Sequence, residues 1–451
     1  MTPVLHRGSR RKLSPAEHIV EGNIVYFVRI EGSFQLQQLR NSLARVQRRH
    51  PALRTLIREE RDGLYYEMDS APEIPLRVVP RLTEDDYQRE CQAELAAEFA
   101  YDQPQLRAVW LQSDNENDLL LVSSHRICDG MSMLIIVREV LRWLYSDEEL
   151  IPYEPVTRQD IIGDYQPPQL WKSKLKARLL NGLLALIPGS RRSHENKEHF
   201  LEWKAERLLL DALKRRCKAE GVSIHSALLV ALDRSLLAAF GEKKLPKWIE
   251  NPVDIRRERF AVLKSDMVFF GGGNFKAQTG QNREIEFWTK ARMINEKMRS
   301  DIEQEMRDIP ARFHFFEMLR PLSRGQVQSI VQLGDALKMN GSWNRFALSN
   351  LGNIAITDSD APFRVKDLRI YMHSLNVRVL CLVTYTLNGE MRFYCVGDEK
   401  CLSHDQAETL KREFMAVLHD QVMQKAESGN TAHSTLASEK EQNAFLQATH
   451  C

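Results

Sequence analysis

Apolar residues follow two different periods along the first 150 positions of the chain. Residues 24–30 carry an apolar side chain at every second position, which predicts a strand, whereas the apolar residues of 36–46 lie three or four apart, which predicts a helix. Further strands are expected in LYYEM, in LRVV and on both sides of the polar turn in RAVWLQSDNENDLLLVSSH, and a further helix in DDYQRECQAELAAEFAYD. The pattern predicts a mixed unit of strands and helices that ends near Tyr153.

The same mixture returns after residue 200. One helix is expected to stop at Gly221, and a second to begin after the cap-like Ser223. Strands are expected in WIENPVDIRRERF, in the glycine-rich FFGGGNF, in ALSNLGNIAI and on both sides of the Asn-Gly turn in LCLVTYTLNGEMRFYCVGD, with helices in EIEFWTKARMINEKMRSDIEQ and AETLKREFMAVLHDQVM. The second part of the chain therefore predicts a second α/β unit.

The segment between the two units contains a basic amphipathic stretch, LWKSKLKARLLNGLLALIPGSRR. Its leucines form a helical stripe, and its lysines are concentrated at its start. Such a helix can lie on a membrane surface, so 172–187 is a candidate for peripheral membrane contact. The alternative, that the helix packs across the two units and solvates its lysines, is the favoured interpretation, because most amphipathic helices face a protein core.

Length and composition narrow the class of protein. At 451 residues the chain is long enough for two lobes, each with its own core. The 63 basic and 61 acidic residues nearly balance, so no nucleic acid partner is expected. No apolar run has the length of a membrane span or of a signal peptide, which favours a cytoplasmic protein. The expected organisation comprises an N-terminal lobe (1–153), a connection (154–200), a C-terminal lobe (201–425) and a disordered polar tail (426–451).

The seven cysteines are scattered singly, which suits a reducing compartment rather than a disulfide framework. No CxxC pair is present, and only His404 follows Cys395 and Cys401 near zinc-ligand spacing. Buried structural thiols are favoured over a metal site, and no metal is expected.

Candidate chemistry is concentrated where one strand ends and a helix begins, in LLLVSSHRICDGMSMLIIVREVL (119–141). The apolar run stops at His125, Asp129 and Gly130, and apolar residues then resume at helical spacing. Buried scaffolds present reactive groups at such junctions. The string H-x-x-x-D-G alone is modest evidence, because it arises by chance in a small share of chains this long. Its weight is raised by three accompanying segments: RRHPALRT (48–55), NPVDIRR (251–257) and SNLG (349–352).

In this order and at these separations, the four segments resemble the superfamily of chloramphenicol acetyltransferase, nonribosomal peptide condensation domains and plant BAHD acyltransferases. Within it, the chain is most similar to stand-alone condensation-like acyltransferases of the mycobacterial polyketide-associated and phthiocerol dimycocerosyl transferase type. The resemblance, from about residue 13 to 423, implies an α/β (α+β) fold of two chloramphenicol-acetyltransferase-like lobes, each a mixed sheet flanked by helices, with the active site in a tunnel between them.

The resemblance also implies roles for single residues. Many members carry two successive histidines, the second of them catalytic. Here Ser124 replaces the first, and His125 corresponds to the second. The acid of the motif, Asp129, is expected to pair with an arginine of the other lobe, which corresponds to Arg256.

Chemistry supports a base at this position without the family. Acyl transfer from a thioester needs a group that takes a proton from a hydroxyl or amine, and a neutral imidazole does so near neutral pH. Asp129 is expected to cap the helix, and Gly130 to let the backbone approach a substrate, with the helix-start N–H groups facing the thioester oxygen. Asn350 is either a hydrogen-bond donor into the cleft or part of a structural turn. His50 is assigned no chemistry and is explained by a helix end before Pro51.

The first hypothesis is therefore an acyltransferase of secondary-metabolite or lipid biosynthesis, in which an acceptor attacks the donor directly without an acyl-enzyme. Its co-substrate is acyl-CoA or a phosphopantetheine thioester on an acyl or peptidyl carrier protein, its acceptor is a small molecule or lipid, and no permanently bound cofactor is expected. Two alternatives stay open: a non-catalytic module that binds a carrier protein, and an amide-forming condensation enzyme acting in trans.

Overall fold

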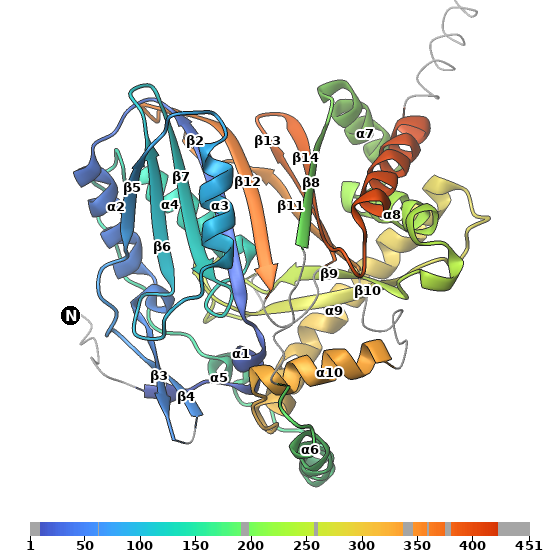
Figure 1. Cartoon of the computed structure of the whole chain (residues 1–451). Coiled ribbons are helices and arrows are strands. Elements are labelled where there is room, and N and C mark those ends of the chain that lie inside the picture. Colours follow the sequence, from blue (N-terminus) through green and yellow to red (C-terminus); the bar gives the residue numbers. More distant parts are fainter. Residues whose placement is uncertain are drawn as a thin grey trace, which may run out of the picture.

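The computed structural model contains two lobes side by side, each built around a mixed β-sheet with helices against it (Figure 1). A small three-stranded sheet lies below the first lobe in this view. The structure describes residues 10–61, 63–190, 198–256, 260–336, 346–358, 360–374 and 380–422. The expected polar tail, 426–451, lies outside the described residues. A mixed α/β fold with sheets flanked by helices confirms the predicted fold class.

The N-terminal lobe contains the five-stranded sheet. Adjacent residues of its strand β2 point to opposite faces, as the pleat of a strand requires. The Tyr26 hydroxyl donates a hydrogen bond to the carbonyl oxygen of Gly130, the first residue of helix α4, while the Phe27 ring packs against Tyr87 of α3. Helices α3 and α4 therefore cover opposite faces of the sheet, and α2 packs beside α4. In sheet order the strands are β12 (Arg364–Ser374), β2 (Gly22–Glu31), β7 (Glu116–Ser124), β6 (Leu106–Gln112) and β5 (Leu76–Pro80), and the helices are α2 (Leu36–Arg49), α3 (Asp86–Ala96) and α4 (Gly130–Arg142).

The C-terminal lobe contains the six-stranded sheet, and its core includes residues of helices α7, α8 and α9 and of the helix at 404–422. The predicted Asn-Gly hairpin is present: Asn388 and Gly389 both adopt positive φ angles, 50° and 81°, between two antiparallel strands. In sheet order the strands are β10 (Gly272–Gln278), β9 (Trp248–Asp254), β11 (Phe346–Ile354), β13 (Cys381–Leu387), β14 (Glu390–Asp398) and β8 (Glu198–Ala205), and the helices are α7 (Arg207–Glu220), α8 (Ile224–Phe240) and α9 (Phe287–Glu317).

Smaller elements lie below and between the two lobes. In Figure 1 the three-stranded sheet lies below the first lobe, α1, α5 and α10 lie beneath the junction of the lobes, and α6 lies below α10. These elements are β1 (Arg10–Lys12), β4 (Gly63–Glu67), β3 (Leu56–Glu60), α1 (Pro15–Ile19), α5 (Arg158–Ile162), α6 (Leu170–Ala185) and α10 (Arg324–Ala336). Short 3-10 turns lie at Pro51–Arg54 and, after α8, at Glu242–Lys244.

One strand departs from the division expected from the sequence. Residues 201–425 were expected to form the C-terminal lobe, but β12 leaves that lobe and pairs antiparallel with β2, in register from Arg364 opposite Glu31 to Ser374 opposite Gly22. Strand β2 is apolar on both faces, so β12 on one side and β7 on the other complete its backbone hydrogen bonds in the interior of the lobe. The chain therefore crosses between the lobes more than once.

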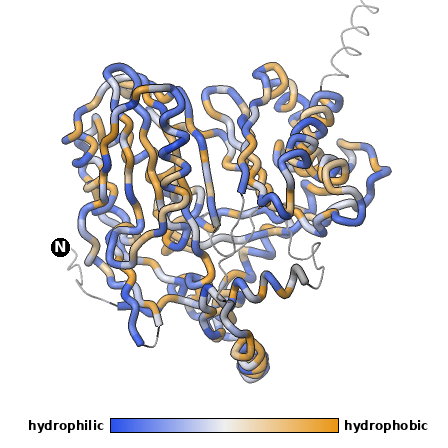
Figure 2. The backbone as a smooth tube through the Cα atoms, in the orientation of Figure 1, coloured by the Kyte–Doolittle hydropathy of each residue, from blue (hydrophilic) through white to orange (hydrophobic). Residues whose placement is uncertain are grey.

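Helix α6 occupies the predicted basic amphipathic stretch, but it does not pack across the two lobes, which was the favoured interpretation. It projects below α10, and only Ala177 among its side chains is buried (Figure 1). Its inner face is held by Asn181, whose side chain donates to the Met318 carbonyl oxygen at 3.0 Å and accepts from the Arg320 N–H at 2.7 Å. Several hydrophobic residues of the helix are exposed, and Figure 2 marks hydrophobic positions along it.

Within the described residues, no single helix is long and apolar enough to cross a membrane. Helices α7 and α8 are long and apolar enough only when taken together, and the chain bends by 106° between them. Most of α8 is buried in the core of the C-terminal lobe. The six cysteines of the described residues are buried free thiols, as predicted.

Candidate active site

His125 lies in the turn between β7 and α4, as the change of period predicted. Its backbone N–H donates to the Gly22 carbonyl oxygen at 2.9 Å, which fixes the turn to the start of β2. His125 is partly exposed as a residue, while the residues that follow it, from Arg126 to Cys128, are buried. A partly exposed histidine therefore follows the end of the buried strand β7.

The hydrogen bond of the His125 ring defines its tautomer. Nδ1 lies 2.7 Å from the carbonyl oxygen of Cys128, and a carbonyl oxygen only accepts hydrogen bonds. In the neutral ring Nδ1 therefore carries the proton, which leaves the lone pair on Nε2. The ring of Phe270 also contacts the imidazole edge-on, at 5.7 Å between centroids. This arrangement is that of a base whose basic nitrogen is Nε2.

The neighbouring thiol is not a competing nucleophile. Burial raises the pKa of Cys128 to about 12, against an ordinary value of 9.0. Its sulfur also lies 3.0 Å from the Ser123 hydroxyl, inside the lobe. The thiol therefore stays protonated near neutral pH, and His125 is the group at this turn with a basic lone pair.

Asp129 performs the two structural functions expected of it. One carboxylate oxygen accepts the Ser132 N–H at 2.7 Å and so caps α4. Both oxygens also accept from Arg256 at 3.0–3.1 Å, which joins the start of α4 to the C-terminal lobe. Because Asp129 occupies the Ser132 N–H, only the earlier N–H groups of α4 could face a thioester oxygen.

Arg256 is the centre of a buried network between the lobes. Its side chain is 1% exposed, and its guanidinium also contacts Asp254 at 2.8 Å and Ser132 at 2.6 Å. Burial opposes the charge, but the carboxylates of Asp129 and Asp254 outweigh burial and raise the pKa of Arg256. The guanidinium also donates to the carbonyl oxygens of Met267 and Phe269, at 2.8 and 2.7 Å. The next residue is Phe270, so the network also positions the ring that contacts His125.

Gly130 and the SNLG segment meet at the start of α4. A Cβ on Gly130 would lie 3.4 Å from the Tyr26 hydroxyl and 3.8 Å from the Leu351 side chain, which is ordinary contact. The fold therefore tolerates a methyl group here.

The side-chain oxygen of Asn350 accepts the Gly352 N–H at 2.9 Å, inside the irregular pairing of β11, so the structural-turn alternative is present. Its role as a donor into the cleft stays a prediction.

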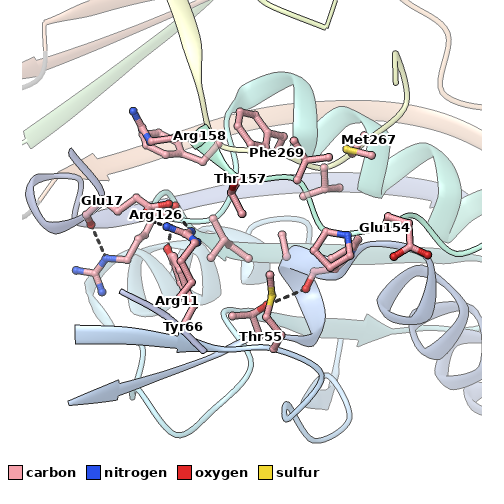
Figure 3. Close-up of a pocket in the computed structure, with 18 residues that line it drawn as sticks. Arg11, Glu17, Thr55, Tyr66, Arg126, Glu154, Thr157, Arg158, Met267 and Phe269 are labelled. Carbon is pink, nitrogen blue, oxygen red and sulfur yellow. Dashed lines mark hydrogen bonds and ion pairs between the residues drawn. The ribbon is translucent and has the colours of Figure 1, made fainter. Parts of the chain in front are cut away.

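Two pockets lie next to the His125 turn. The first has about 600 Å³ of empty space and is lined by Arg126 and Ile127 of the turn and by residues 267–270 from the C-terminal lobe (Figure 3). The second, with about 1500 Å³, is lined by Ser124 and Arg126 and by residues 321–324. The residues around His125 thus face two spaces, as a site with separate donor and acceptor approaches requires. A continuous tunnel stays a prediction.

Sequence reasoning missed two residues of the site, Phe270 and Arg158. Phe270 lies just before a glycine-rich bend and Arg158 in the expected connection, and neither belongs to an apolar pattern with a helix or strand period.

His50 is also more than a helix end: its fully buried ring lies 2.7 Å from the Glu139 carboxylate and accepts the Val268 N–H at 3.3 Å. It joins α2 and α4 to the same segment of the C-terminal lobe. The order HPALR in the sequence does not reveal this contact.

Comparisons with known proteins identify the family. The Condensation domain family model matches residues 12–243, more than half of the chain. Three solved structures are similar along 92% of this chain. Polyketide synthase associated protein 5 from Mycobacterium tuberculosis is 13% identical, with 98% of that chain covered and a TM-score of 0.60. The condensation domain of the Monacolin K polyketide synthase MokA is 12% identical (98% covered, TM-score 0.64), and TRI3 trichothecene 15-O-acetyltransferase from Fusarium sporotrichioides is 12% identical (96% covered, TM-score 0.65). No curated protein matches the sequence. At these identities the solved structures establish the fold, and together with the family match they confirm the resemblance to stand-alone condensation-like acyltransferases. The chain belongs to the Condensation domain family.

Proposed function

We propose that the protein transfers an acyl group from a thioester to a hydroxyl or amine, with His125 as the general base. The observation that carries the proposal is the hydrogen bond between Nδ1 of His125 and the Cys128 carbonyl oxygen, which leaves the Nε2 lone pair free to accept a proton. The donor is acyl-CoA or an acylated carrier protein. Among similar folds are a TRI3 O-acetyltransferase and nonribosomal peptide synthetases, which supports both kinds of donor.

The chemistry consists of one addition and one elimination. Nε2 takes the proton from the acceptor as its oxygen or nitrogen forms a bond to the thioester carbon. The resulting tetrahedral oxyanion collapses, the carbon–sulfur bond breaks, and the imidazolium returns the proton to the departing thiolate. The products are an ester or amide and a free thiol. No residue of the protein is acylated, in keeping with the protonated Cys128.

Asp129 and Arg256 act as positioning residues in this proposal. Their ion pair holds the start of α4, which follows His125 directly, and Arg256 holds the segment that ends at Phe270. Phe270 in turn contacts the imidazole. The base is therefore supported from both lobes, which keeps its ring in one orientation while a substrate enters.

The test is thiol release from a panel of acyl-CoAs and acylated carrier proteins, with and without alcohol or amine acceptors. Release is expected to depend on the acceptor and to match the acylated product found by mass spectrometry. Release without acceptor, together with a mass increase of the protein, would indicate an acyl-enzyme and contradict the mechanism. If no donor in the panel gives acceptor-dependent release, while a carrier protein still binds, the result would favour the non-catalytic alternative.

We also propose that the protein meets its acceptor at a membrane surface. Helix α6 exposes Trp171, Leu175, Leu179, Leu183 and Leu186, whose residues are 50–79% exposed. At 100° per residue these five positions fall within an arc of about 120° on the side opposite Ala177. The tube in Figure 2 marks several hydrophobic residues along the projecting helix.

Charge complementarity favours an anionic lipid surface as the partner of this stripe. Lys174 and Arg178 lie along one side of it, Lys176 along the other and Lys172 just inside that edge, and all four are exposed. Residues 170–187 include no acidic side chain. Each basic residue near an anionic membrane contributes about 1 kcal/mol, and each leucine that becomes fully buried contributes about 1.5–3 kcal/mol. We therefore propose that α6 lies in the interface of an anionic membrane, near a lipid or lipid-linked acceptor.

Vesicle flotation tests the membrane proposal. The protein is expected to float with vesicles of phosphatidylcholine and phosphatidylglycerol, and less with phosphatidylcholine alone or in high salt. The double variant Leu179→Glu, Leu183→Glu should stay at the bottom of the gradient. The matched control, Leu208→Glu, changes a leucine that is 71% exposed on α7 and should float like the parent. Equal flotation of all three proteins, or a dimer in solution that the α6 variant abolishes, would overturn the proposal.

A further inference from the structure

The charged residues of the first pocket are concentrated at one end. In Figure 3, Arg11, Glu17, Arg126 and Arg158 gather there, and Met267 and Glu154 lie at the other end. Phe269, Phe270 and Ile127 add apolar surface to the lining. A pocket of this composition suits a molecule with a carbon skeleton and one polar group.

Two of the three arginines are already paired with carboxylates. Arg11 donates two hydrogen bonds to Glu17, both at 2.8 Å, and Arg126 contacts the Glu21 carboxylate at 2.8 Å. Glu17 accepts a further hydrogen bond from the Ser14 N–H at 2.7 Å, so its oxygens are occupied. Glu21 also lies 3.9 Å from Arg324, so both carboxylates are engaged with arginines other than Arg158.

Arg158 is different, because no hydrogen bond or ion pair to any described residue holds its guanidinium. The residue is 7% exposed, and its Nε is buried without a partner. Its contacts are the faces of Phe313 and Phe270, at 4.6 and 5.5 Å from the ring centroids. Burial lowers the pKa of Arg158, and Glu17 and Glu317 oppose this only through space. A buried charge without a partner destabilises a protein, so the residue indicates a ligand that supplies the missing anion.

We infer that Arg158 binds a carboxylate of the substrate, in the pocket beside His125. The inference rests on the proposed function, because it identifies the substrate class of that same site. With Arg11 and Arg126 paired, Arg158 is the arginine of this pocket without a bonded carboxylate, and Glu17 and Glu317 offset part of its charge through space, which matches a monoanion better than a phosphate dianion. Glu154 carries a further carboxylate, but it lies at the other end of the pocket and is exposed (Figure 3).

The position of Arg158 relates the bound carboxylate to the base. Phe270 contacts Arg158 through its face and His125 through an edge-on contact. A carboxylate on Arg158 is thus separated from the imidazole by about one aromatic ring. The remainder of the molecule would extend along the apolar lining, with its reacting group directed to Nε2.

Calorimetric titration with a matched pair of probes tests the inference without turnover. Benzoate is expected to bind the parent protein about tenfold or more tightly than benzamide, because the charged hydrogen bond is worth about 1.5–3 kcal/mol. Arg158→Met should abolish this preference, and Arg158→Lys should retain part of it. The control Arg299→Met removes an exposed arginine of α9 and should leave both affinities unchanged.

Thermal melting of the same variants separates a binding role from a structural one. Arg158→Met should melt at the same temperature as the parent or higher, since methionine removes an unpaired buried charge. A clearly lower melting temperature, equal binding of benzoate and benzamide, or tighter binding of phenyl phosphate than of benzoate would overturn the inference. Benzoate binding without any acyl transfer would refute the proposed reaction alone, and transfer without a preference for benzoate would refute this inference alone.

Discussion

Replacing His125 with alanine is expected to lower acyl transfer by about 10²–10⁴-fold, the range that a positioned general base contributes. The effect is expected on the chemical step, because the imidazole is the group that would receive the acceptor's proton. The fold should persist, since the ring makes one hydrogen bond, to the Cys128 carbonyl oxygen, and one aromatic contact, to Phe270. Single-turnover thiol release with mass spectrometry of the product measures the change.

The neighbouring residue supplies the control for this experiment. Ser124 replaces the first histidine of the related motif, and its hydroxyl lies 3.4 Å from the Arg126 backbone N–H. Ser124→Ala should therefore transfer within a few-fold of the parent rate, with an unchanged melting temperature. Added imidazole should partly restore the His125→Ala variant and not the parent. Equal single-turnover rates for His125→Ala and the parent would remove His125 from the mechanism.

Replacing Arg256 with methionine is expected to lower the free energy of unfolding by about 3–5 kcal/mol, the range for breaking a buried ion pair. The change leaves Asp129 and Asp254 without their shared cation and removes the donors to the Met267 and Phe269 carbonyl oxygens. Because these groups join the two lobes, the loss should appear in the main unfolding transition. Urea denaturation followed by tryptophan fluorescence measures it.

Asp129→Ala should have a smaller effect, about 1–3 kcal/mol, since Arg256 keeps Asp254 and the variant loses chiefly a helix cap and one charged partner. The double variant Asp129→Ala, Arg256→Met should be more stable than the sum of the single changes predicts, because both remove the same contact. Strict additivity, or an unchanged midpoint for Arg256→Met, would contradict the interlobe network.

The sequence predicted most of the secondary structure because period and turn chemistry are local properties. The strand–turn–helix around His125, the capped helix after Ser223 and the Asn388-Gly389 hairpin all agree with the structure. Helix α10 was not expected, although Ser323 and Gln326 form a capping box at its start, a signal that the sequence also contains. The pairing of β12 with β2 was missed for a different reason. An apolar strand indicates burial, but its own residues do not identify the sheet that it joins.

Part of the candidate site was also accessible from the sequence. The pair Asp129–Arg256 was expected from the family resemblance, and the structure brings the two residues together. Arg158 was not expected, because a charged residue in a connecting segment is ordinarily solvated, and its burial depends on Phe270 and Phe313 from distant segments. The exposure of α6 was likewise hidden, since a leucine stripe has the same pattern whether a core or a membrane covers it.

The crossing of β12 into the N-terminal sheet has a consequence for synthesis on the ribosome. Strand β2 emerges early, but the neighbour that completes its far edge, Arg364–Ser374, is translated only after most of the chain. During that interval a nascent chain exposes an apolar, unpaired edge that favours association with other chains. The first lobe therefore cannot finish folding as an independent unit, and efficient production in a cell would depend on holding this edge apart from other nascent chains until translation is nearly complete.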